Sequence, residues 1–399
     1  MDTINICFVN ENQLIYGVGG VESVSRTLQL EFEKLGHTVY NAFAIQKSSL
    51  CKNDILLPDC EKLDSEINSI ALIEHIKKNN IHIILCQGYT KEIFNLCTKA
   101  KKETQTKLIF TFHRCPHAWK LDYDNYKENV INDTKNIIIR YIKSLYCEIK
   151  RPIHNIKAHL QAEKFFRAYQ IEHIDAFVTL NKEYSNYIKK IFPKEFHGKF
   201  EAITNPLVIT RDKYEPPQKE KIILFIARLT SQKRLDRLLY IWNDIYPLYP
   251  DWRLVIAGEG EYENIYKELS KKLNIERIDF VGQCNLEDLY KKGCILCMTS
   301  SHEGFGLVLA EAQLWGCIPI AYNSFASVND IIINGYNGFL VKPYKKKRYI
   351  KAIRTLLDNE QLVAEMAHNG YTFIERFDVK IIAKSWINLF DKLLRNNYD

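Results

Sequence analysis

The sequence lacks any long hydrophobic run: no uninterrupted apolar stretch of its 399 residues approaches the ~20 residues that a membrane-spanning helix needs. Residues 1–10 have neither the basic flank nor the small-residue cleavage site of a signal peptide, so we expect a cytoplasmic protein. Low-complexity segments and internal repeats are also absent. With 46% apolar and 26% charged residues, the composition is that of an ordinary globular protein. A disordered chain, a collagen-like fibre and a coiled coil are therefore excluded.

Paired cysteines are scarce, because the eleven cysteines are scattered singly apart from Cys294 and Cys297. Such a pair could be redox-active or half of a zinc site, but no second Cys/His pair lies at zinc spacing. Residues three apart on a strand point to opposite faces, and this pair lies in an apolar, strand-like run. We interpret both as buried thiols and expect no metal site.

Positive charge is unevenly distributed in a chain whose net charge is +7. The segment 135–170 contains two acidic residues, Glu148 and Glu163, and eight basic residues. The basic residues are Lys135, Arg140, Lys143, Lys150, Arg151, Lys157, Lys164 and Arg167. A nucleic-acid binder would spread its charge along a groove or recognition element, so we expect no nucleic acid partner. Apolar residues at helical spacing in residues 137–149 predict a basic amphipathic helix that lies on an anionic membrane. The alternative is an insertion packed against the first domain, with its cations solvated.

Apolar, β-rich runs alternate with helical periodicity along the whole chain, which predicts βαβ units around parallel sheets. The expected strands are 4–9, 39–44, 81–86, 108–112, 176–180 and 201–203, then 222–226, 253–257, 278–281, 294–298 and 318–321. A polar segment with paired prolines, residues 214–220, separates the two series. We therefore predict an α/β protein with two Rossmann-like domains whose parallel sheets face a central cleft. The domains are residues 1–214 and 215–379, and a terminal helix in residues 380–399 crosses back toward the first domain.

The strongest constellation runs from Ser301 to Ala312, after a predicted strand and into a predicted helix. Gly304 and Gly306 allow a ligand to approach the backbone, and the free amides of the first helical turn form an anion site. Glu303 and Glu311 are eight residues apart, or roughly 12 Å along a helix, which is long for a hydrolytic carboxylate pair. They are spaced to hold two ends of one long anionic ligand.

These residues resemble the E-x7-E motif of the group 1 family of retaining, nucleotide-sugar-dependent glycosyltransferases, which have the two-domain GT-B architecture. Three further segments are similar to family motifs: Gly17–Glu22 to the amino-terminal glycine loop, Phe225–Lys233 to the loop with an Arg and a Lys five apart, and Asn334–Leu340 to the turn after the donor site. The resemblance covers nearly the whole chain. It implies a donor domain in residues 215–379 and an acceptor-binding domain in residues 1–214.

The resemblance also implies roles for individual residues. Glu311 should bind the ribose hydroxyls and Glu303 the hydroxyls of the transferred sugar, while Arg228 and Lys233 should neutralise the diphosphate as it leaves. His113 matches a histidine that family members place beside the donor sugar. The expected donor-binding backbone is formed by Gly19, Gly20, Gly304, Phe305, Gly306, Leu307 and Val308.

The implied activity is a hexosyltransferase-type retaining transfer of a hexose or N-acetylhexosamine from a UDP-linked donor to a glycan or lipid-linked glycan, as in bacterial surface polysaccharide assembly. No Asp-x-Asp lies where a metal-bridged diphosphate would need it, so we expect neither a metal nor another cofactor. Where many members carry Gly-Gly-x-x-Glu, this chain has Tyr322–Asp330, which leaves the donor sugar open. The alternatives are a sugar-nucleotide epimerase or phosphorylase on the same fold, or a non-catalytic glycan-binding subunit.

Overall fold

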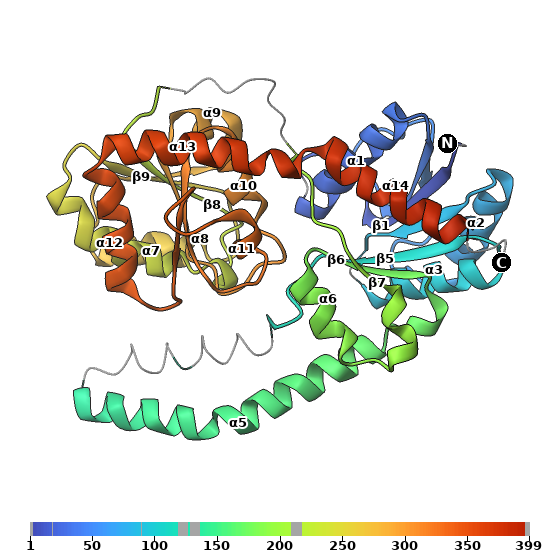
Figure 1. Ribbon diagram of the computed structural model, residues 1–399, viewed down its shortest axis with the longest axis horizontal. Helices are drawn as coiled ribbons and strands as arrows, with labels where there is room; N and C mark the ends of the chain where they lie inside the picture. The colour runs from blue at the N-terminus through green and yellow to red at the C-terminus, as the bar shows by residue number, and fades with distance from the viewer. Residues whose placement is uncertain are drawn as a thin grey trace. The chain divides into compact units, whose positions relative to one another are not determined.

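The chain forms two compact α/β units. The computed structural model describes residues 3–17, 19–88, 90–118, 127, 136–208 and 218–395. Unit 1 comprises Met1–Pro116, Ala162–Val208 and Phe377–Asp399, and unit 2 comprises His117–Gln161 and Ile209–Arg376. Each unit has one sheet whose strand pairs are all parallel (Figure 1), which confirms the predicted fold class. The domain boundary predicted at residues 214/215 lies outside the described residues, as does Lys135.

Unit 1 contains a sheet of strand order β3-β2-β1-β4-β5-β6-β7. Phe8 packs against Phe32 of one helix, which in turn contacts Phe390 of the terminal helix. Phe110 points to the opposite face and meets Phe94 of another helix, so the sheet is covered on both sides. Its strands are β1 (Asn5–Asn12), β2 (Thr38–Ile45), β3 (Asp54–Leu56), β4 (Ile83–Cys86), β5 (Lys107–Phe112), β6 (Ala176–Thr179) and β7 (Phe200–Ala202). Its helices are α1 (Gly20–Lys34), α2 (Glu66–Lys78), α3 (Lys91–Lys102), α6 (Lys182–Lys189) and the terminal α14 (Val379–Arg395).

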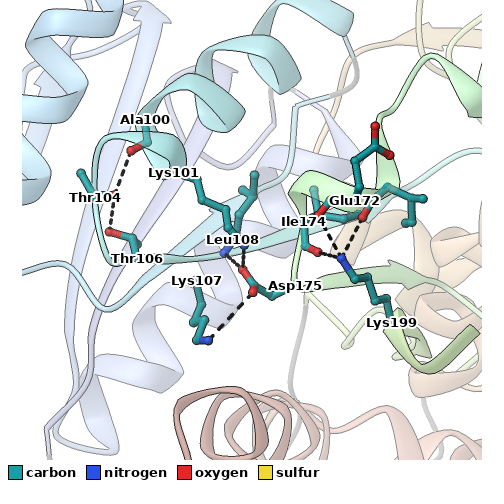
Figure 2. Close-up of polar contacts among 11 residues, drawn as sticks. Ala100, Lys101, Thr104, Thr106, Lys107, Leu108, Glu172, Ile174, Asp175 and Lys199 are labelled. Carbon is teal, nitrogen blue, oxygen red and sulfur yellow. Dashed lines mark hydrogen bonds and ion pairs between the residues drawn. The ribbon is translucent and has the colours of Figure 1, made fainter. Parts of the chain in front are cut away.

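Partly buried charged side chains lie at the amino-terminal ends of strands β5 and β6 (Figure 2). The Asp175 carboxylate accepts hydrogen bonds from Lys101 and from the Leu108 backbone amide. The Lys199 ammonium donates to the carbonyl groups of residues 171, 172 and 174, at 3.1, 3.1 and 2.7 Å. The Lys199 contacts satisfy backbone carbonyls that precede β6, and Asp175 connects the start of β6 to β5, so we assign these residues a structural role.

Unit 2 contains a sheet of strand order β10-β9-β8-β11-β12-β13. The strands are rich in Ile, Leu and Val, as expected of a parallel sheet that is covered on both faces. Cys294 and Cys297 are buried and free, which confirms their interpretation as thiols. The strands are β8 (Ile222–Ile226), β9 (Arg253–Ala257), β10 (Ile278–Gly282), β11 (Ile295–Met298), β12 (Ile318–Tyr322) and β13 (Phe339–Val341). The helices are α7 (Leu235–Ile245), α8 (Glu263–Lys272), α9 (Leu286–Lys292), α10 (Leu307–Leu314), α11 (Val328–Ile331), α12 (Lys346–Leu357) and α13 (Glu360–Ile374).

Helix α5 (Ile137–Arg167) crosses the division between the units and continues through Pro152. It begins in the segment for which an amphipathic helix is predicted. Among the described residues, no helix is both long enough and apolar enough to cross a membrane.

Candidate functional site

The two loops that carry the strongest sequence motifs of unit 2 lie side by side. Strand order reverses between β8 and β11, which are neighbours although β9 and β10 intervene in the sequence. In parallel sheets such a reversal leaves a crevice at the carboxyl ends of the two strands, where ligands bind. The loop after β8 carries Arg228 and Lys233, and the loop after β11 carries Glu303.

The two loops are tied together by backbone and side-chain hydrogen bonds. The Ser301 amide donates to the Gln232 carbonyl at 2.8 Å, and the Gln232 side chain donates to the His302 carbonyl at 2.7 Å. These contacts bring Lys233 Nζ within 2.6 Å of Glu303 Oε1. The Lys233 and Glu303 side chains are 21% and 10% exposed, so the ion pair is largely shielded from water. The structure therefore pairs two residues for which the sequence implies contacts to different parts of a ligand.

Arg228 is exposed, and within the described residues its side chain has no hydrogen bond or ion pair. The position of its loop depends on two glycines after β9, which the sequence analysis missed. A Cβ at Gly258 would lie 2.0 Å from the Ala227 carbonyl oxygen, and one at Gly260 would lie 2.4 Å from the Leu229 carbonyl oxygen. The Gly-Glu-Gly spacing after an apolar strand was the available signal. The loop backbone is thereby fixed, while the guanidinium is free to meet an anion.

The glycine loop leads sharply into α10. Gly306 has φ = 96°, a left-handed conformation that side chains rarely adopt, and it directly precedes the first helical residue Leu307. The amides at this helix start, at Leu307 and Val308, point away from the helix body, where an anion can accept their hydrogen bonds.

A serine turn after β12 supports the same loop. Ser327 Oγ donates to the Gly304 carbonyl at 2.8 Å and contacts the Phe305 carbonyl at 3.2 Å. Ser324 Oγ donates to the Ser300 carbonyl at 2.8 Å. These serines lie in the segment that departs from the family's Gly-Gly-x-x-Glu pattern. In this chain Ser324 and Ser327 therefore support the backbone of the glycine loop.

Glu311 in helix α10 is buried, at 7% exposure. Its Oε2 accepts a hydrogen bond from the Tyr290 hydroxyl at 3.0 Å. Burial raises the pKa of the Glu311 carboxyl, and the tyrosine hydrogen bond lowers it in part. Tyr290 was missed in the sequence, because a lone tyrosine 21 residues from its partner carries no spacing signal.

The remaining predicted site residues belong to unit 1. His113 follows β5 and hydrogen-bonds through Nε2 to Gln87 Oε1, and burial lowers its pKa to about 4. Its imidazole is therefore neutral at pH 7. Gly19 caps α1 and Gly20 begins it, and the Glu22 carboxylate folds back to within 2.3 Å of where a Gly19 Cβ would be.

Among the described residues, no group of three or more His, Cys, Asp or Glu side chains is arranged to hold a metal ion.

Comparisons with known proteins show a family match for part of the chain. Residues 209–373 match the family of glycosyl transferases group 1. An uncharacterized glycosyltransferase of Haemophilus influenzae is 30% identical over 187 residues, which are 46% of this chain and 53% of that protein. A Campylobacter jejuni enzyme, GalNAc-α-(1→4)-GalNAc-α-(1→3)-diNAcBac-PP-undecaprenol α-1,4-N-acetyl-D-galactosaminyltransferase, is 23% identical over 341 residues, covering 82% of this chain and 86% of the enzyme.

The solved structure of the pneumococcal O-GlcNAc transferase GtfA, in complex with UDP and GlcNAc, has the same fold. Its TM-score is 0.71 at 14% identity, and the match covers 99% of this chain and 100% of that chain. The architecture is therefore that of the GT-B glycosyltransferases. The resemblance to the group 1 glycosyltransferases is confirmed by the match of residues 209–373 to that family.

Proposed function

We propose that this protein is a retaining glycosyltransferase that transfers a hexose or N-acetylhexosamine from a UDP-linked donor to a hydroxyl of a glycan or lipid-linked glycan. In this proposal unit 2 binds the donor, and unit 1, which carries His113, Gly19 and Gly20, binds the acceptor. UDP in the GtfA complex and the lipid-linked glycan acceptor in the name of the Campylobacter relative support these assignments.

The observation that carries the proposal is the arrangement at the β8/β11 reversal in unit 2. A buried carboxylate, Glu311, lies in α10, the helix whose start offers free amides, and Lys233 and Glu303 are paired in the loops in front of it. A nucleoside diphosphate sugar matches this order of groups: ribose hydroxyls at Glu311, phosphates at the helix start and cations, and the sugar at Glu303.

The proposed reaction needs no nucleophile from the enzyme. The bond between the anomeric carbon and the diphosphate oxygen breaks, and an acceptor oxygen bonds to the same face of the sugar. The acceptor proton passes to the leaving phosphate oxygen, so atoms and charge balance. Arg228, Lys233 and the first amides of α10 stabilise the negative charge that grows on the diphosphate, which is where preorganised donors lower a barrier most.

The test is transfer from α-linked UDP-glucose, UDP-galactose, UDP-GlcNAc and UDP-GalNAc to short oligosaccharides and to polyprenyl-diphosphate-linked glycans. We expect UDP release together with a product whose new linkage is α by proton NMR. A β-linked product would overturn the retaining mechanism. Free sugar without transfer would favour the epimerase or phosphorylase alternative, and no UDP under any combination would favour a glycan-binding subunit.

For the lipid-linked acceptor we propose that helix α5 attaches the protein to the anionic inner face of a membrane. Seven of its apolar side chains recur every three or four residues and are each 51–68% exposed; they are Ile138, Ile142, Leu145, Ile149, Ile153, Ile156 and Leu160. Monomeric soluble proteins rarely leave so long an apolar stripe uncovered. Helix α5 also carries seven basic and two acidic residues, so its charge complements anionic lipid.

Vesicle sedimentation tests this attachment with two variants. One variant replaces Arg140, Lys143 and Lys150 by Gln, and the other replaces Ile142, Leu145 and Ile149 by Ser. Binding by the wild type should require anionic lipid and fall with added salt, and both variants should bind less. Equal recovery with neutral and anionic vesicles, or unchanged binding by both variants, would contradict the attachment and favour a soluble acceptor.

A further inference from the structure

Tyr290 and Glu311 form a buried, hydrogen-bonded pair within unit 2. The tyrosine lies in the short helix α9 and is fully buried, and its hydroxyl donates to Glu311 Oε2 at 3.0 Å. Among the described residues, Glu311 Oε1 has no hydrogen-bond partner. A carboxylate has about four acceptor positions on its two oxygens, and the tyrosine occupies one of them. Both oxygens therefore keep room for a further donor.

The tyrosine is held in place at its backbone as well as at its hydroxyl. Its carbonyl accepts hydrogen bonds from Lys219 Nζ at 2.7 Å and from Cys317 Sγ at 3.0 Å. Lys219 Nζ also donates to the carbonyl of Trp315, the residue that ends α10, at 2.6 Å. Helix α9 is thereby fixed to the end of the helix that carries Glu311. These contacts therefore fix the direction in which the Tyr290 hydroxyl points toward the Glu311 carboxylate.

Burial alone would favour the neutral form of Glu311. A carboxyl group removed from water has a raised pKa, and a proton on it would remove the acceptor that ribose hydroxyls need. A hydroxyl that donates to the charged form opposes this effect and also fixes the plane of the two oxygens. The groups around the tyrosine are Lys219 and Cys317, and burial raises the pKa of the Cys317 thiol, which keeps it uncharged.

We propose that Tyr290 is a positioning residue for nucleotide binding: it keeps Glu311 ionised and orients the carboxylate so that both of its oxygens face the vicinal hydroxyls of a ribose. The inference rests on the proposed function, because it takes a ribonucleoside diphosphate as the ligand of Glu311. Tyr290 acts only through Glu311 and does not itself touch the nucleotide.

The experiment is a calorimetric titration of the full-length protein with UDP and with 2′,3′-dideoxy-UDP. Tyr290→Phe removes one hydroxyl and keeps the ring, and we expect UDP affinity to fall about tenfold, because the Glu311 carboxylate is then less ionised and less well oriented. Affinity for the dideoxy nucleotide should change little. UDP binding by the variant should also weaken at a higher pH than in the wild type, since the carboxyl then protonates more easily. A merely structural role would affect both nucleotides alike.

Tyr349→Phe is the matched control. Tyr349 is also fully buried in unit 2, but its hydroxyl donates to the Ile320 carbonyl at 2.5 Å and has no contact with Glu311. The control should lose stability and keep its preference for UDP over the dideoxy nucleotide. Should Tyr290→Phe fail to fold, 3-fluorotyrosine at position 290 keeps the ring and makes the hydroxyl a stronger donor. The pH midpoint of UDP binding should then move down, and an unchanged midpoint would contradict the proposal.

Glu311→Gln distinguishes the positioning role of Tyr290 from the proposed donor site. If Glu311→Gln weakens UDP binding and Tyr290→Phe does not, the positioning role is wrong and the proposed donor site stands. If neither variant weakens UDP binding, both are wrong. In the Glu311→Gln background, Tyr290→Phe should add no further loss, because the tyrosine acts through the carboxylate.

Discussion

Replacing Lys233 by Met should destabilise unit 2 by about 2 kcal/mol, because it removes the largely shielded ion pair with Glu303. At the observed 2.6 Å, two unit charges attract by about 6 kcal/mol at an effective dielectric constant of 20 and by about 1.6 kcal/mol in water. Desolvation and side-chain entropy offset part of this attraction. Breaking fully buried pairs costs about 3–5 kcal/mol and exposed pairs about 0.2–1 kcal/mol, and this pair lies between those limits.

Chemical denaturation, followed with a probe in unit 2, measures this loss. Lys221→Met is the matched control, since Lys221 pairs with Asp251 at 3.1 Å but both side chains are more than half exposed. It should change the free energy of unfolding by less than about 0.5 kcal/mol. Lys233→Met/Glu303→Gln, which removes both charges, should recover most of the loss. A loss in Lys233→Met no larger than in the control would refute the claim that Glu303 depends on this cation.

Three further outcomes are expected. Arg228→Ala should lower kcat more than it raises KM, because diphosphate charge grows toward the transition state; steady-state kinetics with unchanged kcat would place the phosphate contact elsewhere. Ser327→Ala should weaken UDP binding by about 1 kcal/mol in calorimetry, because the Gly304 carbonyl loses its hydrogen-bond donor. An unchanged affinity would show that the glycine loop keeps its conformation without Ser327. Unit 1 should lose stability as the pH falls below about 6.5, since burial lowers the pKa of His37 and His82 in the folded state and the unfolded chain then binds more protons. Both rings accept a backbone amide hydrogen bond at Nδ1, so protonation breaks those bonds, and a flat unfolding profile between pH 7 and 5 would contradict this prediction.

Much of the fold could be predicted because most of its strands are buried, apolar runs of four residues or more. Strands β3 and β13 were missed, since each has three residues and its apolar run is too short to distinguish a strand from a loop. The continuation of α5 beyond residue 149 was also not predicted. Pro152 usually ends or kinks a helix, because it lacks an amide hydrogen, yet the helix continues past it to Arg167.

The side-chain contacts of the site could be predicted only in part from the sequence. Glu303, Glu311 and Lys233 were singled out from the local spacing of their motifs. Their partners were not: the Lys233–Glu303 pair and the Tyr290–Glu311 pair join residues 70 and 21 positions apart. Such pairings depend on strand order in the sheet, which a single sequence does not encode locally.

The most direct test of the central claim is release of UDP from a panel of UDP-linked sugars without acceptor, measured in the wild type and in Lys233→Met. We expect slow hydrolysis of at least one UDP-sugar by the wild type. The rate should fall strongly in Lys233→Met and stay unchanged in Lys221→Met. Absence of UDP release and of UDP binding across the whole panel would contradict the assignment of unit 2 as a donor site for UDP-sugars.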